Sequence, residues 1–173
     1  MCVICYKPKG VKMPQKNVLE AMYLANSNGC GYCTPNEIHK GIYFDDFYKE
    51  VKNVSKNEPC LMHFRLATTG SVKRSNCHPF YDGCIDVSFM HNGIFNVRPN
   101  KDITDSEFVF REYFIPIIEQ YGLDSRQMQE VVEEFGDYSK LAFMQGDNVK
   151  LFGNFIKFGD YYFSNLRFIN YLR

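Results

Sequence analysis

Cysteine is the residue type whose spacing in this chain first suggests chemistry. Two Cys-x-x-Cys pairs occur, Cys2 with Cys5 and Cys30 with Cys33. Four thiolates at this spacing suit a tetrahedral zinc ion, which would make the protein a zinc-binding interaction module. Metal binding is therefore one interpretation of Cys2. A second group with suitable ligand types comprises Cys60, His63, Cys77 and His78.

The position of Cys2 permits a different chemistry. Removal of Met1 would leave Cys2 with a free α-amino group beside its own thiol. Such an amine has an ordinary pKa of about 7.7–8.0 and can act as the base for a thiol whose ordinary pKa is about 8.5. A nucleophile activated in this way needs no separate histidine. Cys2 is thus also a candidate N-terminal nucleophile.

The residues that follow Cys2 favour the nucleophile over the metal site. Val3 and Ile4 separate Cys2 from Cys5, and this β-branched, apolar segment predicts a strand rather than the tight turn of a zinc knuckle. Residues three apart in a strand point to opposite faces, so Cys2 and Cys5 would not converge on one ion. Cys5 is then more simply a small core residue. We expect no metal and no cofactor, and the zinc module remains the alternative.

Length and composition bound the class of protein. The chain has 173 residues, 45% of them hydrophobic, and 20 basic residues balance 20 acidic ones. This length fits a single domain over residues 1–173, with a core large enough to need no disulfides. Zero net charge gives no reason to expect nucleic acid or an anionic membrane as a partner. Seven cysteines, no bilayer-spanning stretch and no signal-peptide pattern predict a cytoplasmic protein.

The elements that must position these residues alternate along the chain. The sequence predicts strands at Cys2–Tyr6, Cys60–Leu66, Ile85–Met90, Lys140–Gln145, Lys150–Asn154 and Tyr161–Asn165. It predicts helices at Lys16–Ser27, Phe44–Val54, 105–121 and Ser125–Phe135. Strands at both ends with two helices between them are typical of an α+β fold with mainly antiparallel sheets.

Turn and capping residues separate these elements. Thr104 and Glu107 form a capping box in which Thr104 is the N-cap residue. Asp124 is expected to cap the following helix. The segments Asn28–Gly31 and His91–Gly93 are expected to be turns. Taken singly, each of these features is more often an ordinary turn or cap than part of a site.

Six short motifs follow one another along residues 2–107. They are Met1–Ile4, Asn28–Gly31, His63–Gly70, Asn76–Phe80, Phe89–Gly93 and Thr104–Glu107. In the same order they resemble Met-Cys-Gly-Ile, Asp-Gly-x-Gly, His-x-Arg-x-Ala-Thr-x-Gly, Asn-x-His-Pro-Phe, a strand ending in His-Asn-Gly, and Ser/Thr-Asp-x-Glu of the class II glutamine amidotransferases. Unrelated turns and caps have no reason to recur in this order behind a cysteine at position two.

The resemblance implies a catalytic role for three residues. Cys2 would attack the side-chain amide of glutamine and pass through a thioester, releasing ammonia and then glutamate. The Asn92 side-chain amide and the Gly93 backbone N–H would form the oxyanion hole. Donors of this kind lower the barrier by roughly 3–4 kcal/mol each where they have been measured.

The resemblance also implies a set of substrate-binding residues. Arg65 would hold the α-carboxylate of the substrate through a bidentate pair, with Thr68 and Thr69 beside it. Asp105 would hold the α-ammonium group. His78 would shape the loop around the substrate.

The fold implied by the resemblance is a four-layer αββα sandwich, with two antiparallel sheets between helices, as in Ntn hydrolases. The chain contains no GxxxxGK[ST] or GxGxxG motif that would cradle a nucleotide. If ammonia is transferred to an acceptor, the synthase would therefore be a separate chain. A free-standing γ-glutamyl amide hydrolase is the neighbouring possibility.

Overall fold

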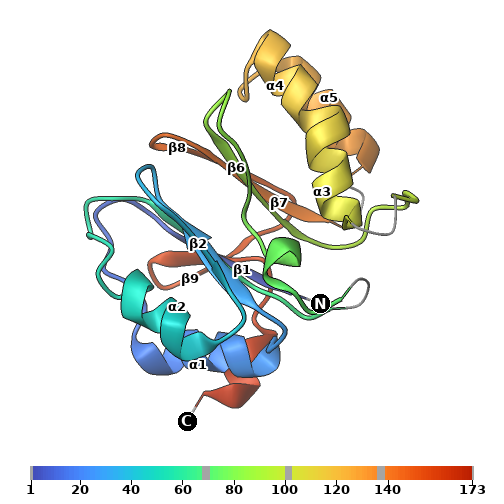
Figure 1. Cartoon of the computed structure of the whole chain (residues 1–173). Helices are drawn as coiled ribbons and strands as arrows, with labels where there is room; N and C mark the ends of the chain where they lie inside the picture. The colour runs from blue at the N-terminus through green and yellow to red at the C-terminus, as the bar shows by residue number, and fades with distance from the viewer. Residues whose placement is uncertain (1, 68–70, 100–102, 136–138, 173) are drawn as a thin grey trace.

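The computed structural model describes residues 2–67, 71–99, 103–135 and 139–172, which form two antiparallel sheets and flanking helices (Figure 1). The larger sheet has six strands in the order β3-β2-β4-β1-β10-β9. These strands are β1 (Val3–Lys7), β2 (Cys30–Cys33), β3 (Ile38–Gly41), β4 (Cys60–Phe64), β9 (Ile156–Phe158) and β10 (Tyr161–Phe163).

The smaller sheet has four strands in the order β5-β6-β7-β8. They are β5 (Phe80–Asp82), β6 (Val87–Asn92), β7 (Lys140–Gln145) and β8 (Asn148–Phe152). Strands β4 and β7 are apolar over most of their length, and β4, β6 and β7 are buried on both faces. Such continuous burial is expected where a sheet is covered on both sides.

Helices cover the outer face of each sheet. Helices α1 (Lys16–Ala25) and α2 (Phe44–Val51) lie against the six-stranded sheet, with a short 3₁₀ helix, Arg167–Tyr171, beside them. On the other side lie α3 (Asp105–Val109), a π-helical turn (Phe110–Phe114), α4 (Ile115–Tyr121) and α5 (Arg126–Phe135) (Figure 1). A further 3₁₀ turn, Arg74–Asn76, precedes β5.

Three separate apolar clusters fill the three spaces between four layers. One packs α1 and α2 on the six-stranded sheet, and another packs α3 to α5 on the four-stranded sheet. The third lies between the sheets and joins Ile4, Cys33 and Leu61 of one sheet to Met90 and Ala142 of the other. The predicted α+β class and the αββα layering are both confirmed.

Several local predictions need correction. Cys30 and Gly31 belong to strand β2 rather than to a turn, and β6 continues through His91 and Asn92, so His91–Gly93 is no hairpin turn. Both segments pair with neighbouring strands, and that pairing overrides their turn propensity. Strands β2, β3, β5 and β9 were not predicted, because short strands of three or four residues carry little periodicity.

The predicted N-cap residue is correct for α3 and wrong for α5. Thr104 accepts a hydrogen bond from the Glu107 N–H at 3.1 Å and caps α3 as expected. The cap of α5 is Ser125, whose hydroxyl accepts from the Met128 N–H at 3.1 Å. The Asp124 carboxylate instead accepts from Asn148 and pairs with Lys150, which holds it away from the helix.

One lysine is buried at the end of the central strand β1. The Lys7 side chain lies out of contact with solvent, and burial lowers the pKa of its ammonium group. Its Nζ donates to carbonyl oxygens of the two loops that flank the strand, namely those of Pro8, Val11, Ser55, Lys56 and Glu58. A single cation therefore holds both loops at this end of the sheet.

Within the described ranges, the helices are all too short or too polar to traverse a lipid bilayer.

Replacement of Lys7 by methionine tests the role of this ammonium group. We expect Lys7→Met to lower the free energy of unfolding by roughly 2–3 kcal/mol, because several buried carbonyls lose a charged donor. Urea unfolding followed by circular dichroism measures the change. Lys9→Met is the matched control, since Lys9 pairs with Asp147 on the surface, where an ion pair contributes less than about 1 kcal/mol. Equal losses in the two variants would contradict the assignment.

Candidate active site

The pairing of β1 with β4 places Cys2 next to Arg65. The two strands are antiparallel with Val3 opposite Phe64, so the next position on each strand sets Cys2 opposite Arg65. The Leu66 N–H donates to Cys2 Sγ at 3.3 Å, and the thiol contacts the Leu66 carbonyl oxygen at 3.6 Å. The nucleophile candidate and the carboxylate-binding candidate therefore share one edge of the larger sheet.

A small pocket of about 40 Å³ opens at this edge. Its wall is built from the start of β1, the end of β4, the segment before β5, the end of β6 and the start of α3. The lining residues are Cys2, Arg65, Leu66, Ala67, Asn76, His78, His91, Gly93, Thr104, Asp105 and Ser106. Five separate parts of the chain thus meet around the sulfur.

The Cys2 sulfur is half-buried in the pocket wall. Burial raises the pKa of its thiol above the ordinary value, while the hydrogen bond from Leu66 and the charge of Arg65 oppose that rise. The direction of the net shift is upward. At neutral pH the sulfur is therefore protonated, and it needs a base before it can attack a carbonyl carbon.

Arg65 is buried and held by main-chain contacts at the end of β4. Its backbone N–H donates to the Gly29 carbonyl at 2.8 Å, and its guanidinium donates to the Ser71 carbonyl at 3.1 Å. The Asn76 side chain donates to the same Ser71 carbonyl at 3.0 Å. Asn28 accepts from the Ala67 N–H at 3.0 Å, so two of the sequence motifs clamp this segment together.

The two candidate oxyanion-hole residues are the last residue of β6, Asn92, and the residue after it, Gly93. The Asn92 side chain is buried, and its Nδ2 donates to Ser164 Oγ at 2.8 Å. The Ile4 N–H donates to the same Ser164 oxygen at 2.8 Å, so one hydroxyl links β6 to β1 and thereby to Cys2. Asn92 Oδ1 has no hydrogen-bond partner among the residues that the structure describes.

Gly93 follows Asn92 at the pocket wall, where a larger residue does not fit. A Cβ atom there would meet the Ser139 hydroxyl and would lie 2.7 Å from His91 Nε2. These are closer approaches than real Cβ atoms make. The glycine therefore lets the backbone pass directly over two buried polar side chains.

Asp105 is the first residue of α3 and is half-buried. Its Oδ2 accepts from the Phe95 N–H at 2.8 Å, which ties the carboxylate to the segment after β6. The first turn of a helix favours an acidic side chain because the helix dipole is positive there. Asp105 therefore presents a fixed negative charge in the same pocket as the positive charge of Arg65.

His78 lies deep in the pocket wall. Its ring contacts His63 with ring centroids 4.2 Å apart and meets Phe80 edge-on at 4.6 Å. Burial lowers the pKa of His78 well below its ordinary value, so the ring is neutral at physiological pH. Within the described part of the chain, neither ring nitrogen has a hydrogen-bond partner. His78 shapes the pocket through packing.

The structure brings most of the predicted site residues together. Cys2, Arg65, His78, Gly93 and Asp105 all line the pocket. Asn92 adjoins Gly93 and is bonded to the serine that also binds β1. The predicted residues Thr68 and Thr69 lie outside the described residues.

Sequence reasoning missed two groups of residues. Leu66, Ala67, Asn76 and His91 line the pocket and occur inside the recognised motifs, so the motifs themselves were the signal. Ser164 and Ser139 lie far from the motifs in sequence. A lone serine carries no pattern, and nothing in the sequence pointed to either.

The cysteines of the zinc interpretation do not converge. Cys5 and Cys30 lie in the cluster between the six-stranded sheet and its helices, whereas Cys33 lies in the cluster between the sheets. Cys60 of the second set also lies on the helix side. In the part of the chain that the structure describes, no three His, Cys, Asp or Glu residues are grouped to hold a metal ion.

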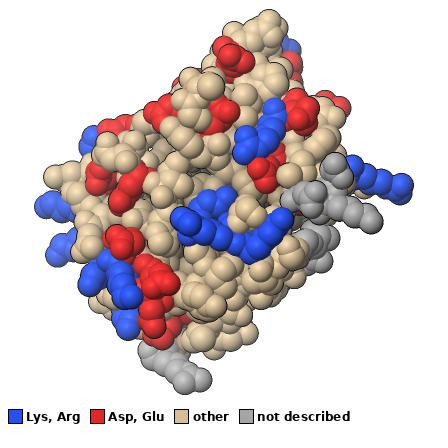
Figure 2. All heavy atoms as spheres, in the orientation of Figure 1, with Lys and Arg blue, Asp and Glu red and all other residues tan. Residues whose placement is uncertain are grey.

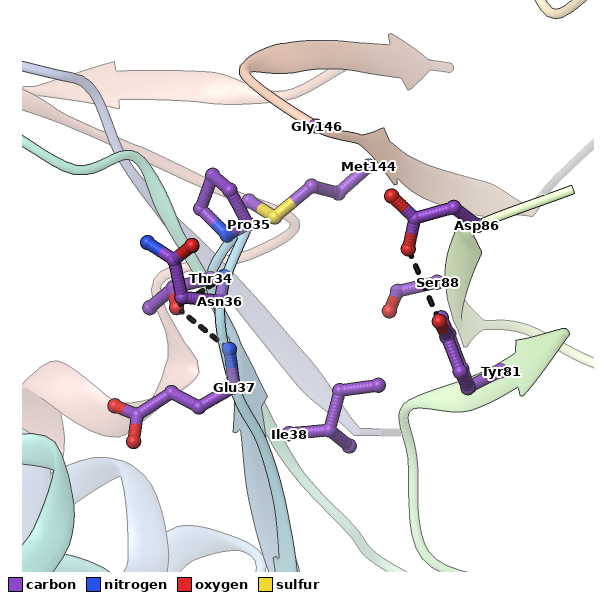
Figure 3. Close-up of a pocket in the computed structure, with 10 residues that line it drawn as sticks. All are labelled: Thr34, Pro35, Asn36, Glu37, Ile38, Tyr81, Asp86, Ser88, Met144 and Gly146. Atoms are coloured by element: carbon purple, nitrogen blue, oxygen red, sulfur yellow. Dashed lines mark hydrogen bonds between the residues drawn. The ribbon is translucent and has the colours of Figure 1, made fainter. Parts of the chain in front are cut away.

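A more spacious pocket, of about 180 Å³, lies at the opposite end of strand β6 from the Cys2 pocket (Figure 3). Strand β6 connects the two sites, because Ser88 near its start lines this second pocket and His91 near its end lines the Cys2 pocket. The side chains around it include Glu37, Asp86 and Tyr81, with the Tyr81 hydroxyl donating to Asp86. Its described lining has no cysteine or histidine, so it offers no nucleophile of the kind found at Cys2.

The surface around the molecule mixes charges of both signs. Figure 2 shows acidic and basic side chains interspersed over the face drawn, with one group of Lys and Arg near its centre. Lys40 and Arg74 are joined at the 3₁₀ turn Arg74–Asn76, because Arg74 donates to the Lys40 carbonyl and Lys40 donates to that of Ser75. A mixed surface agrees with the zero net charge of the chain.

A comparison with solved structures finds proteins whose fold is similar to that of this chain. A glutamine phosphoribosylpyrophosphate amidotransferase from B. subtilis, complexed with ADP and GMP, matches 94% of this chain with a TM-score of 0.59 and 16% sequence identity. A second match, described as the allosteric regulatory enzyme of purine biosynthesis, also covers 94% of this chain, with a TM-score of 0.59 and 14% identity. The chain therefore shares the αββα fold of the matched part of these two proteins.

The likeness is one of fold, and it covers only part of those proteins. The chain spans 41% of the length of each of the two matched chains. A scan of protein-family models finds no match, and a search of curated proteins finds no similar sequence.

Replacement of Gly93 by alanine tests the close approach at the end of β6. We expect Gly93→Ala to lower the free energy of unfolding by roughly 1–3 kcal/mol, because the new methyl group overlaps Ser139 and His91. Chemical denaturation measures the loss. Gly83→Ala is the matched control, since a Cβ at Gly83 would meet the Tyr81 ring at an ordinary 3.6 Å. A Gly93 variant as stable as the Gly83 variant would show that the pocket wall is loosely packed.

Proposed function

We propose that the protein is a class II glutamine amidotransferase-type hydrolase that releases ammonia from glutamine. The observation that supports this best is the meeting of Cys2, Arg65, Gly93 and Asp105 around one pocket, although they come from four different elements. The Ntn-type amidotransferase fold is consistent with this chemistry.

The charges in the pocket suit a free amino acid. Glutamine carries an α-carboxylate and an α-ammonium group at one end and an amide at the other. The guanidinium of Arg65 matches the carboxylate, and a planar fork can bind it through two parallel hydrogen bonds. The carboxylate of Asp105 matches the ammonium group. Thr68 and Thr69 are proposed to complete the binding of the substrate backbone, and His78 to bound the space around it.

The proposed reaction begins with attack of the Cys2 sulfur on the amide carbon. The C–S bond forms as the carbonyl π electrons move to oxygen, which becomes an oxyanion. Asn92 and the Gly93 N–H are proposed to stabilise that charge. Collapse of this intermediate breaks the C–N bond, and the leaving nitrogen takes a proton and departs as ammonia. Water then attacks the thioester, which yields glutamate and regenerates the thiol.

The base for the first step is proposed to be the α-amino group of Cys2 itself. The pKa of the buried thiol is raised, so a proton must be removed before attack. The pocket contains imidazoles, but burial lowers the pKa of His91 to about 3 and that of His78 well below its ordinary value. Such rings are weak bases. Removal of Met1 would supply an amine whose basicity suits neutral pH.

The fate of the ammonia is a separate part of the proposal. We propose that a synthase partner accepts the ammonia from this site. A free-standing γ-glutamyl amide hydrolase uses the same pocket and chemistry, and it is distinguished by full turnover of the purified chain alone.

Substitution of Cys2 tests the proposed nucleophile. We expect Cys2→Ser and Cys2→Ala to lower glutamine-dependent ammonia release by about 10³-fold or more while the fold survives, because the covalent path is lost. A coupled glutamate assay measures turnover. Intact-mass spectrometry of the unsubstituted protein should show loss of Met1 and a single adduct after treatment with a glutamine-like chloroketone.

Cys84→Ala is the matched control for the thiol chemistry. Cys84 is an exposed free cysteine that is not among the residues lining the pocket, so its removal should leave both turnover and the adduct unchanged. Undiminished turnover by Cys2→Ala, or an adduct that maps to another cysteine, would refute the mechanism.

The dependence of the reaction rate on pH tests whether the α-amino group of Cys2 is the base. The free amine acts only when it is unprotonated, so kcat/KM should fall as pH drops below an apparent pKa of about 7.7–8.0. The raised pKa of the thiol means that the sulfur does not ionise by itself in this range. Initial rates between about pH 6 and 9 measure the profile. A rate that is constant from pH 6 to 8 would exclude the amine as the base.

A further inference from the structure

A buried histidine joins two elements of the pocket wall, β6 and α3, to the residue that precedes β7. His91 lies in β6, and its Nδ1 is 2.8 Å from the Ser106 hydroxyl at the start of α3. Its Nε2 is 2.9 Å from the hydroxyl of Ser139, which immediately precedes β7. All three side chains are buried. Both polar edges of the imidazole are therefore bonded, in contrast to the ring nitrogens of His78.

The chain of hydrogen bonds has a preferred direction. Ser106 Oγ lies 3.5 Å from Asp105 Oδ1, and a carboxylate can only accept. With the Ser106 proton turned towards Asp105, Ser106 Oγ would accept from His91 Nδ1–H. A neutral imidazole then has an acceptor at Nε2, to which Ser139 donates. Burial lowers the pKa of His91 to about 3, which keeps the ring neutral and preserves this order.

The same series of hydrogen bonds lies next to two residues of the pocket, Gly93 and Asp105. On one side, His91 Nε2 and Ser139 Oγ lie directly beneath Gly93, where a Cβ atom would collide with them. On the other side, the His91 ring stacks on Phe95 with centroids 3.9 Å apart, and the Phe95 N–H holds Asp105 Oδ2. A shift of the imidazole would therefore move Gly93 and Asp105 together.

We propose that Ser139 and Ser106, acting through His91, are positioning residues that set the separation between the Gly93 N–H and the Asp105 carboxylate. This inference rests on the proposed glutaminase function. In that reaction Gly93 contacts the developing oxyanion and Asp105 contacts the α-ammonium group. The hydrogen bonds through His91 thus set the distance between Gly93 and Asp105 to suit the distance between the oxyanion and the α-ammonium group of the substrate.

A double-mutant cycle tests the coupling. We expect Ser139→Ala to lower kcat by about 10-fold with little change in KM, because His91 Nε2 loses its donor beneath Gly93. We expect Ser106→Ala to raise KM by about 10-fold, because Asp105 loses its link to His91. The double variant should lose less in kcat/KM than the product of the single losses, since both serines act through one ring.

Two controls separate positioning from general damage to the core. Ser88→Ala removes another buried hydroxyl of strand β6, at the end remote from the Cys2 pocket, and should leave kcat and KM unchanged. Ser139→Thr keeps a hydroxyl and should restore most of kcat. Losses that multiply in the double variant, or a Ser139→Ala enzyme with unchanged kcat, would overturn the proposal.

A spectroscopic readout keeps this test independent of the proposed function. Long-range ¹H–¹⁵N correlation spectra of the four histidines should show His91 as the Nδ1–H tautomer, neutral down to about pH 5. Ser139→Ala should shift the His91 Nε2 resonance, and Ser88→Ala should leave it in place. An Nε2–H tautomer of His91 would overturn the proposed order of hydrogen bonds even in an active enzyme. The predicted tautomer in a protein without glutaminase activity would instead refute the function alone.

Discussion

The antiparallel register of β1 on β4 is the constraint on which the site depends. Val3 faces Phe64, so Cys2 and Arg65 leave their strands at the same edge of the sheet, and the Leu66 N–H reaches the sulfur. These two strands lie in the middle of the six-stranded sheet, where neighbours on both sides hold them. A slip of one residue would turn every side chain of β1 to the other face and remove Cys2 from the pocket.

The second sheet supplies the remainder of the site, and a few polar contacts hold it in place. The apolar layer between the sheets is non-directional and would tolerate small displacements. Ser164 removes that freedom, because its hydroxyl accepts from the backbone of Ile4 in one sheet and from the Asn92 side chain in the other. Directional hydrogen bonds thus determine how the end of β6 meets the start of β1.

In the pocket, Arg65 and Asp105 supply the charges, whereas the histidine rings contribute through packing and hydrogen bonds. Arg65 and Asp105 carry opposite charges, whereas the three histidines near them are uncharged, since burial lowers the pKa of His63 and His91 to about 3 and that of His78 well below its ordinary value. The imidazoles therefore act as packed rings and hydrogen-bonding links. In the proposed reaction these rings are weak bases, and for that reason we assign the thiol proton to the α-amino group of a terminal Cys2.

The sequence by itself determined the motifs and the chemistry that is proposed for them. The apolar segment Val3–Ile4 indicated a strand, Thr104 indicated a helix start, and the order of the motifs indicated which residues would meet. Only the tertiary structure decided that Cys30 and Gly31, like His91 and Asn92, lie in strands instead of turns, and that Ser139 and Ser164 support the site. Local propensity is a property of neighbouring residues, whereas these contacts join positions as many as 160 residues apart, such as Ile4 and Ser164, and exist only once two sheets have packed together.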